Sequence, residues 1–144
     1  MAYLPSLWAM QIKFDPIRRW YRRLVLADEY EVWLLTWLPE QRTGFHDHGP
    51  SAGAFVVALG TLQEVTARAG HPVPRTRTLT GGAVRSFGPA YIHDVRNDSA
   101  DLAVSVHAYS PPLTSMRSST STPAGRSAPW ARSERGSRPG TVSR

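Results

Sequence analysis

The strongest constraint on the fold is a series of short segments rich in β-branched and aromatic residues, separated by Gly, Pro, Ser and Asn turns. The segments typical of strands are EVWLLTWL from Glu31 to Leu38, Gly44–His48, Gly53–Gly60, Thr61–Arg68, Arg75–Leu79, Ala83–Phe87, Tyr91–Val95 and Leu102–Tyr109. Such a series without intervening helices predicts an all-β sandwich or barrel. One short helix is expected before it, over residues 15–24, because Asp15 suits an N-cap and Pro16 the first turn, and because Ile17, Trp20 and Leu24 would share one helix face. The alternative is that the same stretch becomes a strand by Tyr21.

The chain divides into a folded body and a basic tail. Its 144 residues are enough for one ordinary domain. Lys and Arg number 11 against 10 Asp and Glu in residues 1–113, but 6 against 1 in residues 114–144, which are mostly Ser, Arg, Thr, Gly and Pro. We therefore expect an N-terminal extension (1–14), one domain (15–116) and a disordered tail (117–144).

Composition also limits the classes of function. Because the body is nearly neutral and has no basic stripe, the net charge of +6 does not predict nucleic-acid binding. No segment has the length and apolarity of a membrane span, and the first residues lack the pattern of a secretory signal, so a cytoplasmic location is expected. The chain has no cysteine, so that any metal site must use nitrogen or oxygen ligands.

Three of the five histidines are spaced for a metal site. His46 and His48 lie two residues apart in an extended segment, so both imidazoles point to one face of the sheet. His93 lies on another expected strand, and three imidazoles on facing strands suit Fe, Zn, Cu or Ni while leaving open coordination positions. The alternative is that His46 and His48 merely flank the polar turn HDHGPS. His71, in the loop AGHPVP, is given no role.

A second polar group alternates along the last expected strand. In LAVSVHAYSPPL, the side chains of Ser105, His107 and Tyr109 share one face, and Val and Ala side chains take the other. If the polar face points outward, it is the solvated face of a strand. If it points inward, the three groups form a hydrogen-bond relay.

Two motifs resemble those of the cupin superfamily: GFHDH at 44–48 with the later Gly60, and HDVRN at 93–97. The run SVHAYSPP, together with HDHG, resembles the cysteine dioxygenase type I family of cupins, over about 21–116. This resemblance implies a cupin double-stranded β-helix, which is a jelly-roll-like barrel. Where the first cupin motif usually has a Glu ligand, this chain has Gly53, which leaves three neutral histidines. In animal members the same position is a cysteine linked to the tyrosine, a cross-link that this chain cannot form.

The resemblance also implies an activity and residue roles. It implies a thiol dioxygenase that converts L-cysteine and O2 to cysteine sulfinate, with one Fe(II) per chain on His46, His48 and His93. Ser105 would orient His107, which would orient the hydroxyl of Tyr109 toward bound substrate. The substrate carboxylate would bind Arg23, which matches a Tyr-x-Arg pattern beginning at Tyr21, with the neighbouring Arg22 as the alternative.

Other substrates and a different class of function stay open from the sequence. 3-Mercaptopropionate or another small thiol could replace cysteine, and a non-catalytic cupin could hold a metal or a small ligand in the same three-histidine site. The expected partners are the small thiol and O2, without nucleic acid or membrane. The expected state is a monomer or a weak dimer, since an exposed strand edge favours association.

Overall fold

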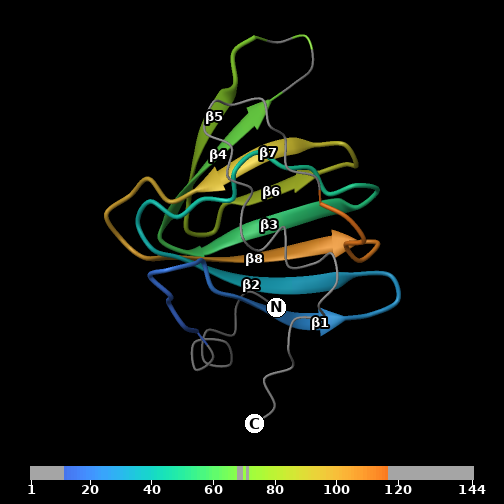
Figure 1. Ribbon diagram of the computed structural model, residues 1–144, viewed down its shortest axis with the longest axis horizontal. Helices are drawn as coiled ribbons and strands as arrows, with labels where there is room; N and C mark the ends of the chain where they lie inside the picture. Colours follow the sequence, from blue (N-terminus) through green and yellow to red (C-terminus); the bar gives the residue numbers. More distant parts are fainter. Residues whose placement is uncertain (1–11, 68–69, 71, 117–144) are drawn as a thin grey trace.

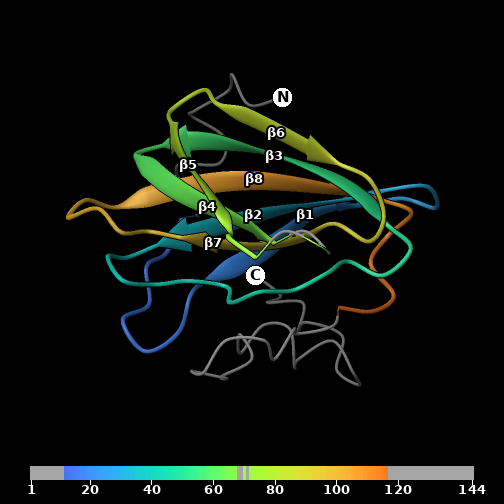
Figure 2. The ribbon, with the colours of Figure 1, turned by 90° about the horizontal axis from the view of Figure 1, so that it is seen from above.

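The computed structural model describes residues 12–67, 70 and 72–116, which form eight β-strands and no helix. They are β1 (Tyr21–Leu26), β2 (Glu31–Trp37), β3 (Ala52–Leu59), β4 (Thr61–Ala67), β5 (Arg75–Thr80), β6 (Val84–Phe87), β7 (Ile92–Arg96) and β8 (Ala103–Ser110). The strands make two antiparallel sheets, in the orders β1-β2-β8-β3-β6 and β5-β4-β7. The smaller sheet lies along the β3 and β6 side of the larger one (Figures 1 and 2).

The all-β architecture predicted from the sequence is confirmed. Seven of the eight expected segments are strands whose ends differ from the expected ends by one residue in most cases. The exception is 44–48, which is a loop that forms one isolated β-bridge to β7, between His46 and His93. The described residues contain no helix that could cross a membrane. The predicted tail at 117–144 and most of the predicted extension at 1–14 lie outside the described residues.

The helix expected over residues 15–24 is wrong. Asp15 Oδ1 does accept the backbone N–H groups of Ile17 and Arg18, at 2.8 and 3.3 Å, as an N-cap would. No helical turn follows, and the side chain of Ile17, expected on the buried helix face, is 89% exposed. The alternative of a strand by Tyr21 is confirmed, because β1 begins there and pairs with β2. The extended backbone satisfies its amides in the sheet and half-buries every second side chain.

The core lies between the two sheets and is built mainly from alternate residues of the strands. Its buried apolar members are Trp33, Leu35, Trp37, Phe55, Val57, Leu62, Leu79, Phe87, Val95, Ala103 and Tyr109. Full burial of one such large side chain contributes about 1.5–3 kcal/mol. Within this apolar interior, the β2–β8–β3 register places His107 between Trp33 and Phe55. A polar group is thus set into the core of the larger sheet.

Gly60 carries the chain from the larger sheet to the smaller one. It is the single residue between β3 and β4, and its φ is +78°, a value that L side chains rarely adopt. A Cβ at this position would overlap the carbonyl oxygen of Leu102. The tight passage brings β4 beside β7, where Thr66 pairs with His93 and Glu64 pairs with Val95.

Candidate metal centre

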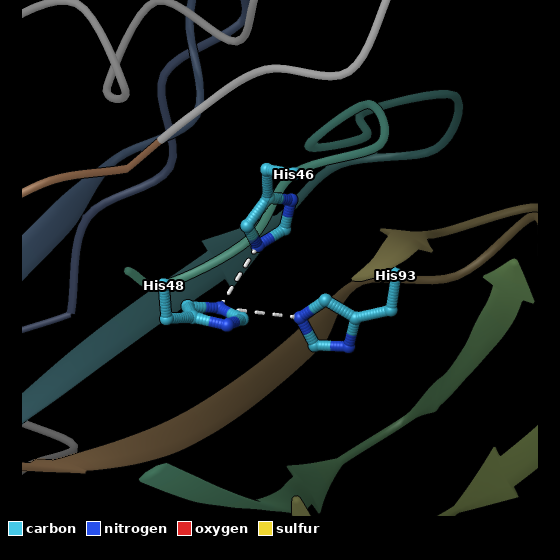
Figure 3. A group of neighbouring side chains, drawn as sticks. All are labelled: His46, His48 and His93. Atoms are coloured by element: carbon cyan, nitrogen blue, oxygen red, sulfur yellow. Dashed lines mark hydrogen bonds between the residues drawn. The ribbon is translucent and has the colours of Figure 1, made fainter. Parts of the chain in front are cut away.

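Three buried histidines converge on one point inside the barrel. His46 and His48 lie in the loop before β3, whereas His93 lies on β7 (Figure 3). The Nε2 atom of His48 is 3.1 Å from that of His46 and 3.3 Å from that of His93. The backbones of His46 and His93 also exchange two hydrogen bonds, of 3.0 and 3.2 Å. The predicted histidine cluster is therefore formed, and His46 and His48 do not flank an exposed turn.

A turn at Gly44 orients His46. Gly44 has a φ of +75°, and its N–H donates to Oδ1 of Asp94 at 2.9 Å. Asp94 follows His93 on β7, so this contact ties the loop to the strand that carries the third histidine. The carbonyl oxygen of Gly44 then lies 2.8 Å from Nδ1 of His46. Since a carbonyl only accepts, Nδ1 carries the proton and Nε2 keeps its lone pair for a metal.

Glu64 orients His93 from behind. Its carboxylate, fully buried on β4, accepts a hydrogen bond from Nδ1 of His93 at 3.0 Å. It also accepts from Arg85 Nε at 2.8 Å and from the hydroxyl of Tyr91 at 3.0 Å. Burial alone would raise the pKa of Glu64, but the hydrogen bonds from His93 and Arg85 outweigh it and lower this pKa to about 2. An ionised carboxylate therefore holds the proton of His93 on Nδ1 and leaves Nε2 with a lone pair that could bind a metal.

The role of Glu64 was missed in the sequence. It is the one acidic residue of the segment 61–68, and it shares the buried face of β4 with Leu62. An acid at an inward position of a strand is the signal that would have pointed to it.

His48 is held by packing. Its ring stacks against the rings of Phe87 and Tyr109, with centroid distances of 4.7 and 5.1 Å. Its Nδ1 is buried without a hydrogen-bond partner among the described residues. Burial, together with the proximity of His93, lowers the pKa of His48 to about 3. Burial and the neighbouring His93 and His48 likewise lower the pKa of His46. Both imidazoles are therefore neutral near pH 7, as metal binding requires.

The donor set fits a metal with three nitrogen ligands. Among the described residues, the only group of candidate ligands is His46, His48 and His93, whose donor atoms lie within 4.8 Å of one another. No carboxylate joins them. At Gly53, where the cupin pattern has Glu, an added Cβ would lie 2.6 Å from the Phe87 ring and 3.0 Å from Tyr109. Three neutral imidazoles with open positions suit Fe(II), Zn, Cu or Ni.

The polar face of β8 points inward. Ser105, His107 and Tyr109 are all buried. Ser105 Oγ lies 2.8 Å from His107 Nε2, and His107 Nδ1 lies 3.4 Å from Tyr109 Oη. Phe55 stacks on the His107 ring at 4.8 Å. Burial, with His93, Arg19 and His48 nearby, lowers the pKa of His107, so this histidine is neutral. The three side chains are thus joined to one another, and the ring of Tyr109 stacks on His48 of the histidine cluster.

Arg23 lies on the interior face of β1, whereas Arg22 is exposed on the other face. One guanidinium nitrogen of Arg23 is 3.6 Å from a carboxylate oxygen of Glu31, which pairs with Tyr109 across β2 and β8. The guanidinium also lies over the ring of Trp33, 5.4 Å from its centroid. The structure therefore brings Arg23 to the Tyr109 side of the interior, where an acidic residue already contacts it.

Arg19 is a second cation in the interior, and the predicted helix gave no indication of its burial. Its guanidinium is buried and lies 4.4 Å from the centroid of the Trp37 ring. Burial lowers the pKa of Arg19 to about 9, although Tyr109, Tyr21 and Asp94 act to raise it. The alternation of Arg19, Tyr21 and Arg23 in an extended segment was the available signal. His71, which was given no role, lies outside the described residues.

The fold and the sequence can both be compared with known proteins. The family model described as cysteine dioxygenase type I matches residues 2–121. A Klebsiella pneumoniae structure with a double-stranded β-helix domain is 13% identical, with a TM-score of 0.66, and the match covers 76% of this chain and 90% of that chain. An RmlC-like cupin protein from Desulfovibrio desulfuricans is 19% identical, with a TM-score of 0.60 and coverages of 71% and 91%. For an oxalate oxidase the identity is 13%, the TM-score 0.63, and the coverages 72% and 56%.

No curated protein matches the chain. The structural neighbours confirm the cupin double-stranded β-helix, since at these identities a likeness in structure reports the fold. The matched residues of the family model include the whole described body with its three histidines and the buried polar face of β8. This chain belongs to the cysteine dioxygenase type I family, whose members are cupin thiol dioxygenases.

Proposed function

We propose that this protein is a non-haem Fe(II) dioxygenase that converts L-cysteine and O2 to cysteine sulfinate. The observation that carries the proposal is the buried cluster of three histidines, with no carboxylate among its donors, in a chain of this family. In the reaction both atoms of O2 become the sulfinate oxygens, the sulfur is the group oxidised, and the thiol proton is released. Atoms and electrons balance without another reductant.

His46, His48 and His93 are the residues that would hold the iron. Bound there, Fe(II) supplies the O2 chemistry and a site for the substrate thiolate. Because the three ligands are neutral, they leave the charge of a divalent ion uncompensated. That imbalance favours an anionic substrate group such as a thiolate over a neutral one.

Tyr109 is the residue proposed to contact bound substrate. Its ring stacks on His48, so its hydroxyl lies near the histidine cluster and is anchored through His107 and Ser105. A hydroxyl held in this way stabilises negative charge on a substrate carboxylate or on developing oxygen anions. His107 is a positioning residue in this scheme, and it is not a metal ligand.

Arg23 is the residue proposed to bind the substrate carboxylate. A planar guanidinium matches a carboxylate in charge and in geometry. Its present contact with Glu31 is a 3.6 Å ion pair in which the Arg23 side chain is 31% exposed, an arrangement that a substrate carboxylate can displace. Arg19 is the other cation that faces the same interior. Separate variants of the two arginines decide between them.

The first experiment measures O2 uptake by the full chain reconstituted anaerobically with Fe(II), on addition of L-cysteine or 3-mercaptopropionate. Mass spectrometry with labelled O2 follows the product. Cysteine sulfinate carrying both labelled atoms is expected. Faster turnover of 3-mercaptopropionate than of cysteine would identify 3-mercaptopropionate as the preferred substrate. Bound metal without O2 uptake would favour a metal-binding cupin without turnover.

The carboxylate contact is tested in the same assay. Arg23→Ala is expected to raise the Michaelis constant for cysteine about 10–100-fold, the loss of a charge-assisted contact of about 1.5–3 kcal/mol. With cysteamine, which lacks the carboxylate, the same variant should behave as the wild type. Arg22→Ala, which removes an exposed arginine from the same strand, is the matched control. An effect of Arg19→Ala alone would move the role to Arg19.

A further inference from the structure

The buried relay on β8 has a fourth member on β2. The indole N–H of Trp37 donates to Ser105 Oγ at 2.8 Å, and Trp37 is fully buried. Ser105 Oγ in turn lies 2.8 Å from Nε2 of His107. The hydrogen-bond chain therefore runs from Trp37 through Ser105 and His107 to Tyr109. An indole N–H donates only, so this end of the chain has a fixed direction.

The donor-to-acceptor direction of the first hydrogen bond determines that of the next ones, because each group can donate only a limited number of hydrogens. Within the described ranges, the partners of Ser105 Oγ are Trp37 Nε1 and His107 Nε2. Since Trp37 supplies a hydrogen, the serine hydrogen must go to His107 Nε2. If His107 instead carried its proton on Nε2, both Trp37 and His107 would donate to Ser105 Oγ. The buried hydroxyl hydrogen of Ser105 would then have no acceptor among the described residues. An unsatisfied buried donor is unfavourable, so this arrangement is disfavoured.

We propose that Trp37 is a positioning residue that sets the direction of the Trp37–Ser105–His107–Tyr109 chain, so that neutral His107 carries its proton on Nδ1. His107 then donates to Tyr109 Oη, which lies 3.4 Å from Nδ1. Because the tyrosine oxygen accepts this bond, the hydroxyl hydrogen of Tyr109 is directed to another acceptor. Tyr109 thus acts as a donor toward anionic oxygen at the site. The functional part of this inference rests on the proposed dioxygenase activity, but the tautomer does not.

The geometry around Trp37 supports such a role. The Arg19 guanidinium lies 4.4 Å from the centroid of the Trp37 ring and packs against it. A cation on the ring face holds the indole in place and strengthens its N–H as a donor. Phe55 stacks on His107, with an interplanar angle of 9°, and so limits rotation of the imidazole. Neighbouring side chains therefore hold the indole of Trp37 and the imidazole of His107 in place.

The experiment reads the tautomer directly. Full-length protein labelled with ¹⁵N-histidine is saturated with zinc, which is diamagnetic, and long-range ¹H–¹⁵N correlation identifies the protonated nitrogen of His107. The wild type is expected to show the Nδ1–H form alone. In Trp37→Phe the serine hydroxyl is free to turn away, and the Nε2–H form should become populated. Because no substrate is present, the result does not depend on the proposed activity.

Trp33 provides a matched control on the same strand. It too is buried and carries an arginine on its ring, at 5.4 Å, but its indole N–H has no hydrogen-bond partner among the described residues. Trp33→Phe should therefore leave the His107 tautomer unchanged. If Trp37→Phe does not fold, benzothienylalanine at position 37 keeps the bicyclic shape and removes only the N–H.

Two results would overturn the inference. One is a wild-type His107 protonated at Nε2, and the other is an unchanged tautomer after the N–H at position 37 is removed. A kinetic readout completes the test with iron-loaded protein. Trp37→Phe should lower turnover at saturating cysteine about fivefold, the equivalent of one hydrogen bond of about 1 kcal/mol. The tautomer result stands if the kinetic one fails, so the two conclusions are separable.

Discussion

The histidine cluster is supported by two polar networks of opposite character. Behind His93 lies a charged network, in which a fully buried Glu64 carboxylate binds Arg85 and Tyr91. Beside His48 lies a neutral chain that runs through Tyr109, His107, Ser105 and Trp37. The first network orients His93, a proposed metal ligand, and the second anchors Tyr109, the group proposed to face the substrate.

The difference has an energetic consequence. A buried carboxylate that loses its partners costs several kcal/mol, whereas one neutral hydrogen bond contributes about 1 kcal/mol. We therefore expect changes in the charged network to affect metal binding and stability, and changes in the neutral chain to affect turnover. Each prediction below separates the two networks by a measurable quantity.

The largest effect is expected from the ligands themselves. His46→Ala, His48→Ala or His93→Ala should each abolish retention of Fe(II) after gel filtration, together with O2 uptake, because two imidazoles do not form the site. The measurement is metal content per chain. His107→Gln, which alters a buried histidine of the neutral chain, should retain iron. Loss of iron from His107→Gln, or its retention in the three alanine variants, would contradict the assignment.

Acid should destabilise the metal-free protein in a defined window. The folded-state pKa of His48 is about 3, and those of His46 and His107 are also lowered, against about 6.5 in an unfolded chain. Below pH 6.5 the unfolded chain therefore binds more protons, and stability falls with pH. The expected loss at pH 5.5 is on the order of 1 kcal/mol for His48, to which His46 and His107 add in the same direction, measured by urea unfolding against pH 7.5.

The charged network responds to acid at lower pH. Because the folded pKa of Glu64 is about 2, its contribution is fully present above its unfolded pKa of about 4.3 and is lost only as pH falls further. A free energy of unfolding that stayed constant between pH 7.5 and 5.5 would show that the buried histidines are not held neutral.

Glu64→Gln should weaken metal binding without removing it. The amide oxygen can still accept from His93, but the negative charge is lost and the amide N–H group faces Arg85. Replacement of such a partner typically lowers metal affinity about 10–100-fold. Competition with a chelator measures the affinity. Glu29→Gln, the same change at an exposed position, is the control and should have no effect.

The sequence was sufficient for the fold and for the polar residues that stand in regular patterns. Period-two alternation identified Ser105, His107 and Tyr109 as one face, and the HDH spacing identified two of the histidines. The same reasoning failed where local and tertiary preferences compete. Asp15 forms its capping bonds, but the chain that follows is extended because pairing with β2 satisfies its backbone.

Contacts between distant segments could not be predicted from the letters. Glu64 is 29 residues from His93, and Trp37 is 68 residues from Ser105 in the sequence. Each meets its partner only because the strand order places β4 beside β7 and β2 beside β8. The burial of Arg19 is another feature that could not be predicted from the sequence. Its burial depends on the registration of β1 against β2, which a helical interpretation of the same residues excludes.

The smallest effects distinguish the networks through one tyrosine in each. Tyr109→Phe keeps the ring that stacks on His48 and removes only the hydroxyl, so we expect unchanged metal affinity and turnover about tenfold lower, near 1.4 kcal/mol in the barrier. Tyr91→Phe removes a hydrogen bond to Glu64, so it should lower metal affinity about fivefold and leave turnover of the fully loaded enzyme unchanged. Metal titration and O2 uptake on both variants test the contrast. If both substitutions changed the same quantity, the two networks would not be separate in function, and the charged and neutral sides would act as one unit around the histidines.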